Sequence, residues 1–171
     1  MDSHQCVETT SKPCDTGSEL DTLKRDKKFD AIDFSLVDPV FPDKTSSVGK
    51  KYFYTKQAIL ARGRECIEKL YHAPHKWVIV VSHSGFLRTG MVGRYFDNAD
   101  YRVYDFVDPN LNDTADVSHG LKGVPGLKQW KSTLRGGSGN SDPKPFELGF
   151  GLPDSDEDGL EKQAEGMTGT K

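Results

Sequence analysis

The segment Trp77-Val78-Ile79-Val80-Val81-Ser82-His83-Ser84-Gly85 carries the strongest fold signal in this chain. Its first five residues form a short apolar, β-branched run, which is typical of a strand buried on both faces of a parallel sheet. The polar residues that follow form a turn, and apolar residues at helical spacing resume from Phe86. We therefore predict a buried parallel strand over 77–81 and a helix beginning near Gly85.

A helix precedes this predicted strand. Thr55 can cap it, and Ile59 and Leu70 lie close to one face of a helix that continues to about residue 71. Pro74 ends the helix because proline cannot continue the helical hydrogen-bond pattern. Helix, strand, turn and helix in this order make half of an α/β repeat. The predicted fold class is therefore α/β: a partial three-layer α/β/α domain with a parallel sheet, over residues 1–108.

The sequence changes character beyond Asp108. Eleven of its 17 glycines lie from Gly120 onward, and an acidic run occupies residues 154–158. A segment of this composition cannot bury enough apolar area to offset the entropy lost on ordering. We therefore expect residues 109–171 to form a disordered glycine-rich, acidic tail, with an acidic interaction segment as the alternative.

The overall composition excludes several classes of partner. A net charge of -3 gives no broad basic field that would attract nucleic acid or an acidic membrane. No apolar run approaches the roughly 20 residues of a membrane helix, and residues 1–13 lack a secretion signal, so a cytoplasmic or nuclear location is expected. The three cysteines fit neither a disulfide framework nor a zinc pattern, so we expect no metal.

His83 is the candidate for chemistry in the predicted turn. Ligands bind at the carboxyl ends of parallel strands, where a following helix points its free amides outward. The small residues Ser82, Ser84 and Gly85 would let backbone amides approach an anion while the imidazole polarises it from the side. We therefore predict a phosphate pocket, with Ser84 and Gly85 as phosphate-binding residues. The alternative is that His83 caps a helix or bonds a buried carbonyl.

A serine hydrolase elbow also follows a buried strand with a sharp turn into a helix. It requires the pattern Gly-x-Ser-x-Gly around the nucleophile. Counting back from Gly85 places His83 at the nucleophile position and Val81 at the first glycine. The register therefore does not support serine hydrolysis.

Two segments of the chain resemble motifs of a known family. Residues 80–87, VVSHSGFL, are similar to the second-histidine motif of the histidine phosphatase superfamily. Residues 7–18, VETTSKPCDTGS, resemble the segment around the acid/base glutamate in fungal members of its phosphoglycerate-mutase-like branch. The resemblance spans about Cys6 to Phe106. It implies a phosphoenzyme reaction that needs no metal or organic cofactor.

The resemblance assigns roles to two side chains. His83 is the second histidine, which hydrogen-bonds the transferring phosphoryl group, and Glu8 protonates the leaving oxygen. This division of work predicts that the two lie within one phosphate's reach of each other. An ordinary solvated carboxylate remains the alternative for Glu8, since Val7 and Thr9 say little about its burial.

The family's nucleophile is a first histidine in an Arg-His-Gly motif, and the sequence lacks that motif. None of the arginines is followed by histidine; they are Arg25, Arg62, Arg64, Arg88, Arg94, Arg102 and Arg135. We therefore expect a C-terminal portion whose N-terminal half is missing, through a truncated gene model rather than real loss. Without the nucleophile, this chain is not expected to turn over a phosphomonoester as fast as a complete member.

Two functions follow as hypotheses. The first is phosphomonoester hydrolysis or phosphoryl transfer in the full-length form, on a phosphorylated small molecule or a phosphoprotein. The alternative is a non-enzymatic remnant or interaction protein that uses its acidic tail. The sequence leaves the substrate and the oligomeric state open.

Overall fold

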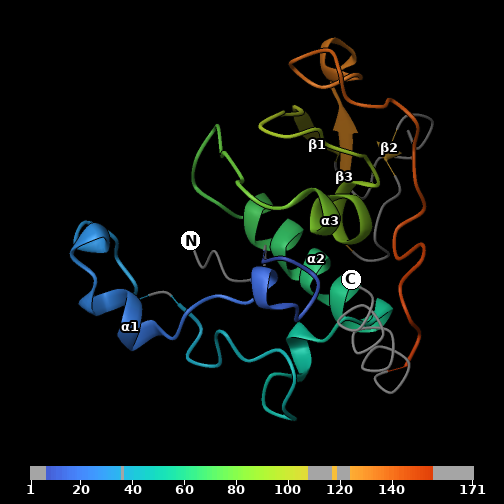
Figure 1. The fold of residues 1–171 in the computed structure, drawn as a ribbon. Coiled ribbons are helices and arrows are strands. Elements are labelled where there is room, and N and C mark those ends of the chain that lie inside the picture. Colours follow the sequence, from blue (N-terminus) through green and yellow to red (C-terminus); the bar gives the residue numbers. More distant parts are fainter. Residues whose placement is uncertain (1–6, 36, 108–116, 119–123, 156–171) are drawn as a thin grey trace.

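Helices form the centre of the computed structural model, which describes residues 7–35, 37–107, 117–118 and 124–155. The longest helix, α2 (Lys56–Tyr71), packs against the short helix α3 (Ser84–Phe86) and its π-helical continuation η5 (Leu87–Val92). Figure 1 shows these helices in the middle, with the sheet on one side and α1 (Leu20–Arg25) set apart. Short 3₁₀ turns complete the helical elements: η2 (Pro13–Asp15), η3 (Lys27–Phe29), η4 (Lys50–Tyr52) and η6 (Lys131–Thr133).

Helix α2 begins and ends close to where the sequence predicts. The Thr55 hydroxyl accepts a hydrogen bond from the amide of Ala58 at 3.3 Å, which confirms the predicted cap. The buried side chains of this helix pack into the hydrophobic core. That core consists of Ile59, Cys66, Ile67 and Leu70 from α2, with Phe86, Met91, Val92, Val124, Leu127 and Leu148 from later segments.

Two glycines allow the helices to approach closely. A Cβ atom added at Gly63 would lie 1.7 Å from the carbonyl oxygen of Gly90, so the backbone of η5 rests directly on α2. At Gly90 itself, a Cβ would meet Ile59 and Phe86 at 3.1 Å. The packing of η5 on α2 therefore depends on the absence of a side chain, above all at position 63.

The sheet is antiparallel. Strand β3 (Gly126–Gln129) pairs with β1 (Tyr104–Val107) on one side and with β2 (Val117–Ser118) on the other, so the order is β1-β3-β2. None of the described strands is parallel, and helices do not cover both faces of a central sheet. The predicted α/β fold, a partial three-layer α/β/α domain with a parallel sheet, is therefore wrong.

The predicted strand over 77–81 is also wrong, because the segment joins no ladder in the described structure. Trp77, Ile79 and Val81 are 67%, 90% and 88% exposed, whereas Val80 packs against the core. Val78 is also exposed, at 39%, so Val80 is the one residue of this segment that packs against the core. A parallel strand needs a neighbour reached by a crossover connection, and no described segment provides one.

The turn that follows behaves as predicted. Helix α3 begins at Ser84, next to Gly85, and the His83 carbonyl accepts the first hydrogen bond, from the amide of Leu87 at 3.0 Å. The helical prediction is therefore confirmed although the strand before it is absent. The apolar spacing after the turn was sufficient, because Phe86 and Met91 point into the core formed with α2.

The expected tail differs from the structure over residues 124–155. Val124, Leu127 and Leu148 are buried in the core. The buried guanidinium of Arg102 donates to the carbonyls of Leu134 at 2.6 Å and Asp142 at 2.9 Å, and so ties this segment to the sheet region. Residues 108–116, 119–123 and 156–171 lie outside the described residues. Among the helices of the described residues, none combines the length and the hydropathy of a membrane span.

Candidate functional site

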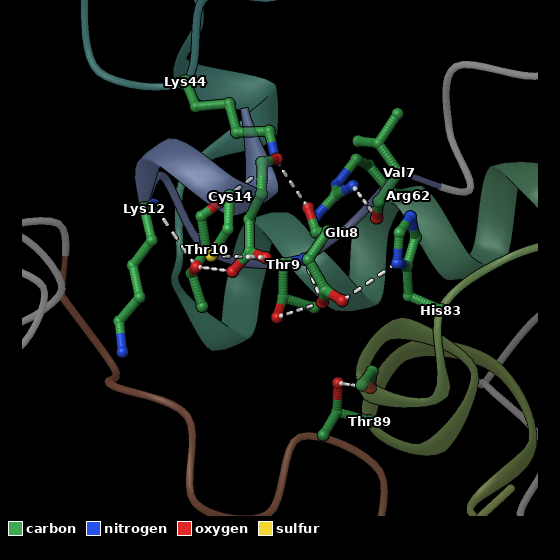
Figure 2. Close-up of polar contacts among 12 residues, drawn as sticks. Val7, Glu8, Thr9, Thr10, Lys12, Cys14, Lys44, Arg62, His83 and Thr89 are labelled. Atoms are coloured by element: carbon green, nitrogen blue, oxygen red, sulfur yellow. Dashed lines mark hydrogen bonds and ion pairs between the residues drawn. The ribbon is translucent and has the colours of Figure 1, made fainter. Parts of the chain in front are cut away.

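The structure brings Glu8 and His83 into direct contact. Glu8 Oε2 lies 3.2 Å from His83 Nδ1, and Figure 2 shows the other ring nitrogen pointing away from the carboxylate. The second carboxylate oxygen accepts hydrogen bonds from the Thr9 amide at 2.7 Å and the Thr9 hydroxyl at 3.1 Å. The Glu8 side chain is 19% exposed and that of His83 is 57% exposed, so the imidazole remains open to a ligand.

Lys44 holds the loop that carries Glu8. Its ammonium donates to the carbonyls of Glu8 at 3.0 Å, Thr10 at 2.9 Å and Asp15 at 2.5 Å, so three points of the loop share one cation. Burial, together with the nearby Arg62 guanidinium, lowers the pKa of Lys44 to about 8, while the carboxylates of Asp15 and Glu8 act in the opposite direction. Lys44 therefore fixes the position of Glu8 through its backbone.

Arg62 supports the same loop from α2. Its side chain is 2% exposed, and Nη1 donates to the Val7 carbonyl at 3.4 Å. The guanidinium lies over the Phe86 ring at 5.0 Å and over the Tyr52 ring at 5.6 Å. The backbone carbonyls of Val7, Glu8 and Thr10 are thus held by two buried cations, Arg62 from α2 and Lys44 from the loop at position 44 (Figure 2).

The two predicted phosphate-binding residues have different surroundings. A Cβ at Gly85 would lie 2.9 Å from Glu8 Oε1 and 3.6 Å from Thr9 Oγ1, so the missing side chain gives the carboxylate room beside the helix. Ser84 Oγ accepts a hydrogen bond from the amide of Phe96 at 3.1 Å. Gly85 therefore belongs to the Glu8–His83 site, whereas the Ser84 hydroxyl is engaged in holding the segment after η5.

The structure places His83 in a different setting from the one that the sequence predicts. His83 was predicted at the carboxyl end of a parallel strand, and the described residues contain no parallel strand. His83 is instead the residue before α3, as the capping alternative proposed, but its side chain makes no cap hydrogen bond and contacts Glu8. The contact between these two side chains, rather than a sheet edge, now defines the site.

Sequence reasoning missed three supporting residues: Thr9, Lys44 and Arg62. A signal existed for Arg62, because it stands three residues after Ile59 on the apolar face of α2, where a cation needs a partner. No pattern points to Lys44, since its three acceptors are backbone carbonyls. Arg88, which was not predicted as a site residue, lines a cavity between η5 and residues 146–152.

The pair can carry out proton transfer. A carboxylate that holds one imidazole nitrogen orients the ring and sets which nitrogen carries the proton, so the opposite nitrogen is presented to a ligand. The described residues contain no group of three His, Cys, Asp or Glu side chains that could hold a metal ion.

Comparison of this chain with protein-family models, with curated proteins and with solved structures finds no match. The roles of Glu8 and His83 therefore depend on the motif resemblance and on the geometry of the pair.

Proposed function

We propose that Glu8 and His83 form the acid–base half of a phosphomonoester site of the histidine phosphatase type. The observation that carries this proposal is the 3.2 Å contact between Glu8 Oε2 and His83 Nδ1. Two motifs far apart in the sequence were assigned to one reaction, and their key side chains meet. The substrate class is a phosphorylated small molecule or a phosphoprotein, since the exposed imidazole leaves room for either.

The chemistry follows from which atoms can donate. With Nδ1 held by Glu8, the outward-facing ring nitrogen of His83 can donate a hydrogen bond to a phosphate oxygen. Glu8, in its protonated form, then delivers its own proton to the leaving oxygen. Thr9 and the Lys44-bound loop hold the carboxylate in place during this step.

The nucleophile is not part of this proposal for the chain as written. The sequence contains no Arg-His-Gly motif, so the residues described here bind and protonate but do not attack phosphorus. We therefore expect phosphate binding without rapid turnover.

Calorimetric titration with phenyl phosphate tests the proposal. We expect the wild-type chain to bind it, and His83→Gln and Glu8→Gln each to weaken binding by roughly tenfold, the first because the hydrogen-bonding imidazole is lost and the second because no carboxylate orients the ring. His72→Gln is the matched control, because His72 is an exposed histidine at the end of α2. Equal affinities of wild type, His83→Gln and Glu8→Gln would refute the proposal.

A specific observation favours a second function, that of an interaction protein. Trp77, Ile79 and Val81 expose three apolar side chains on one face of an extended segment, and such a patch on a monomer often marks a contact surface. The Trp77 ring meets Trp130 edge to face, with centroids 6.1 Å apart, so the patch continues onto the segment after β3. Ile79→Lys should then lower self-association or partner binding without changing phenyl phosphate affinity; an unchanged sedimentation profile would count against this function.

A further inference from the structure

A cavity lies outside the Glu8–His83 pair, among residues that were not assigned to the site. Its volume is about 210 Å³, and its lining comes from the η5 helix and the segment 146–152, with Tyr54 before α2. An apolar cavity of about 150 Å³ can hold a benzene ring in another protein. The space beside η5 is therefore large enough for one aromatic ring with a small substituent.

The cavity and the pair are one helical turn apart. Thr89, which lines the cavity, donates from its hydroxyl to the Gly85 carbonyl at 2.8 Å. Gly85 in turn is the residue whose missing side chain makes room for Glu8. Figure 2 shows Thr89 below the Glu8–His83 contact. Thr89 therefore connects the cavity to the helical turn that adjoins Glu8.

The walls of the cavity are held in place by backbone hydrogen bonds. The Gly149 amide donates to the Thr89 carbonyl at 2.8 Å, and the Phe146 amide donates to the Gly93 carbonyl at 2.9 Å. The amide of Lys56, at the start of α2, donates to the Pro153 carbonyl at 2.8 Å. The segment 146–153 is thus fastened to both helices, and the cavity between them is preformed.

The chemistry of the lining selects an aromatic anion. Tyr54, Phe146, Phe150 and Leu152 supply apolar and aromatic surface. Arg88 adds a guanidinium that lies over the Phe146 ring, 5.4 Å from its centroid. Among the described residues, Arg88 makes no hydrogen bond or ion pair, so the N–H groups on its edge are available to a ligand. Guanidinium groups bind carboxylates through two parallel hydrogen bonds.

We infer that this cavity binds an aromatic carboxylate and serves as the subsite for the leaving alcohol of the substrate. The role as a leaving-group subsite rests on the proposed function, because the bound ring is part of a leaving alcohol only if a phosphomonoester binds at Glu8 and His83. The ligand class itself follows from the cavity alone: an aromatic ring against Phe146 and Phe150, and a carboxylate on Arg88. Glu147, exposed at the edge, is the one carboxylate in the lining and disfavours a second anionic group.

The test uses the full chain and three probes, followed by calorimetry and by amide chemical shifts of η5 and residues 146–152. The probes are 4-hydroxybenzoate, which is the alcohol alone, phenol, which lacks the carboxylate, and inorganic phosphate. Arg88→Gln should weaken 4-hydroxybenzoate about tenfold and leave phenol and phosphate unchanged. Phe150→Ala should weaken 4-hydroxybenzoate and phenol alike; Phe150 is largely exposed, so this variant keeps the fold.

The matched control is Arg64→Gln, which removes an exposed arginine from α2 away from the cavity and should change none of the three affinities. Unchanged 4-hydroxybenzoate affinity in both Arg88→Gln and Phe150→Ala would overturn the inference, as would shifts confined to residues outside η5 and 146–152. The two proposals fail separately. If the chain does not bind phosphate but its affinity for 4-hydroxybenzoate still depends on Arg88, the proposed phosphomonoester site is refuted and the proposed cavity ligand is supported.

Discussion

Replacing Gly63 by alanine should destabilise the protein, although alanine is the better helix former. Gly63 stands in the middle of α2, where glycine normally costs about 1 kcal/mol relative to alanine. A substitution made on propensity alone would therefore be expected to stabilise the helix by that amount. The structure predicts the opposite, a loss of stability in Gly63→Ala.

The reason is the contact with η5. The new Cβ would lie 1.7 Å from the Gly90 carbonyl oxygen and 2.6 Å from its carbon, and both atoms belong to backbone. The helices must separate by more than about 1 Å to relieve this overlap, and the core between them would lose close packing. Overpacking of this kind costs about 1–3 kcal/mol and occasionally more. Loosened contacts of Ile59 and Phe86 add to this cost, so we expect a net loss of about 2–4 kcal/mol after the propensity gain.

Urea denaturation followed by circular dichroism measures this change. The matched control is Ala61→Gly on the exposed face of the same helix, which should cost about 1 kcal/mol through propensity alone. Gly63→Ala should be clearly less stable than this control. A Gly63→Ala variant as stable as wild type, or more stable, would refute the close approach of α2 and η5.

Three further predictions concern buried polar groups. Burial lowers the pKa of Lys44 from 10.5 to about 8, so between pH 8 and pH 10.5 the folded chain holds fewer protons than the unfolded chain. The free energy of unfolding should therefore rise with pH across that window, by up to about 1 kcal/mol per pH unit. This rise should vanish in Lys44→Met. The buried Tyr104 hydroxyl has no hydrogen-bond partner among the described residues, and burial raises its pKa; Tyr104→Phe should therefore be neutral or stabilise by about 1 kcal/mol in urea titrations, and a loss above about 1 kcal/mol would contradict this. Arg102→Met should abolish amide-exchange protection across residues 131–142, since it removes the hydrogen bonds to Leu134 and Asp142; retained protection would show that the sheet holds this segment without Arg102.

Local signals in the sequence predicted the helices well and the sheet badly. The Thr55 cap, the apolar stripe of α2 and the start of α3 each depend on residues that are close together in the sequence. The run 77–81 has the composition of a buried strand, but a strand exists only where a neighbour completes its ladder, and composition does not show whether one is present. The segment 124–155 was predicted to be disordered, although the structure shows that it packs against the core. Its order comes from hydrogen bonds to distant side chains such as Arg102 and Asp100, which leave no periodic pattern.

The site shows the same division. Glu8 and His83 were predicted from motifs, and the structure places the two side chains in contact although the fold that the resemblance implied is not the one observed. The residues that hold the pair were not identified, because Lys44 acts through backbone carbonyls and Gly85 through the absence of a side chain. Such roles depend on distances that a linear pattern does not contain.

The most direct test of the central claim is the response of the His83 ring to phosphate, followed by NMR of the chain with ¹⁵N-labelled histidine. His83→Gln assigns the signal, and His72 and His75, both exposed, serve as internal references. Addition of inorganic phosphate should shift the His83 nitrogens in a saturable way, leave the references in place, and lose most of its effect in Glu8→Gln, because the carboxylate orients the ring. A His83 signal that does not move, or moves no more than those of His72 and His75, would show that Glu8 and His83 do not form a phosphate site.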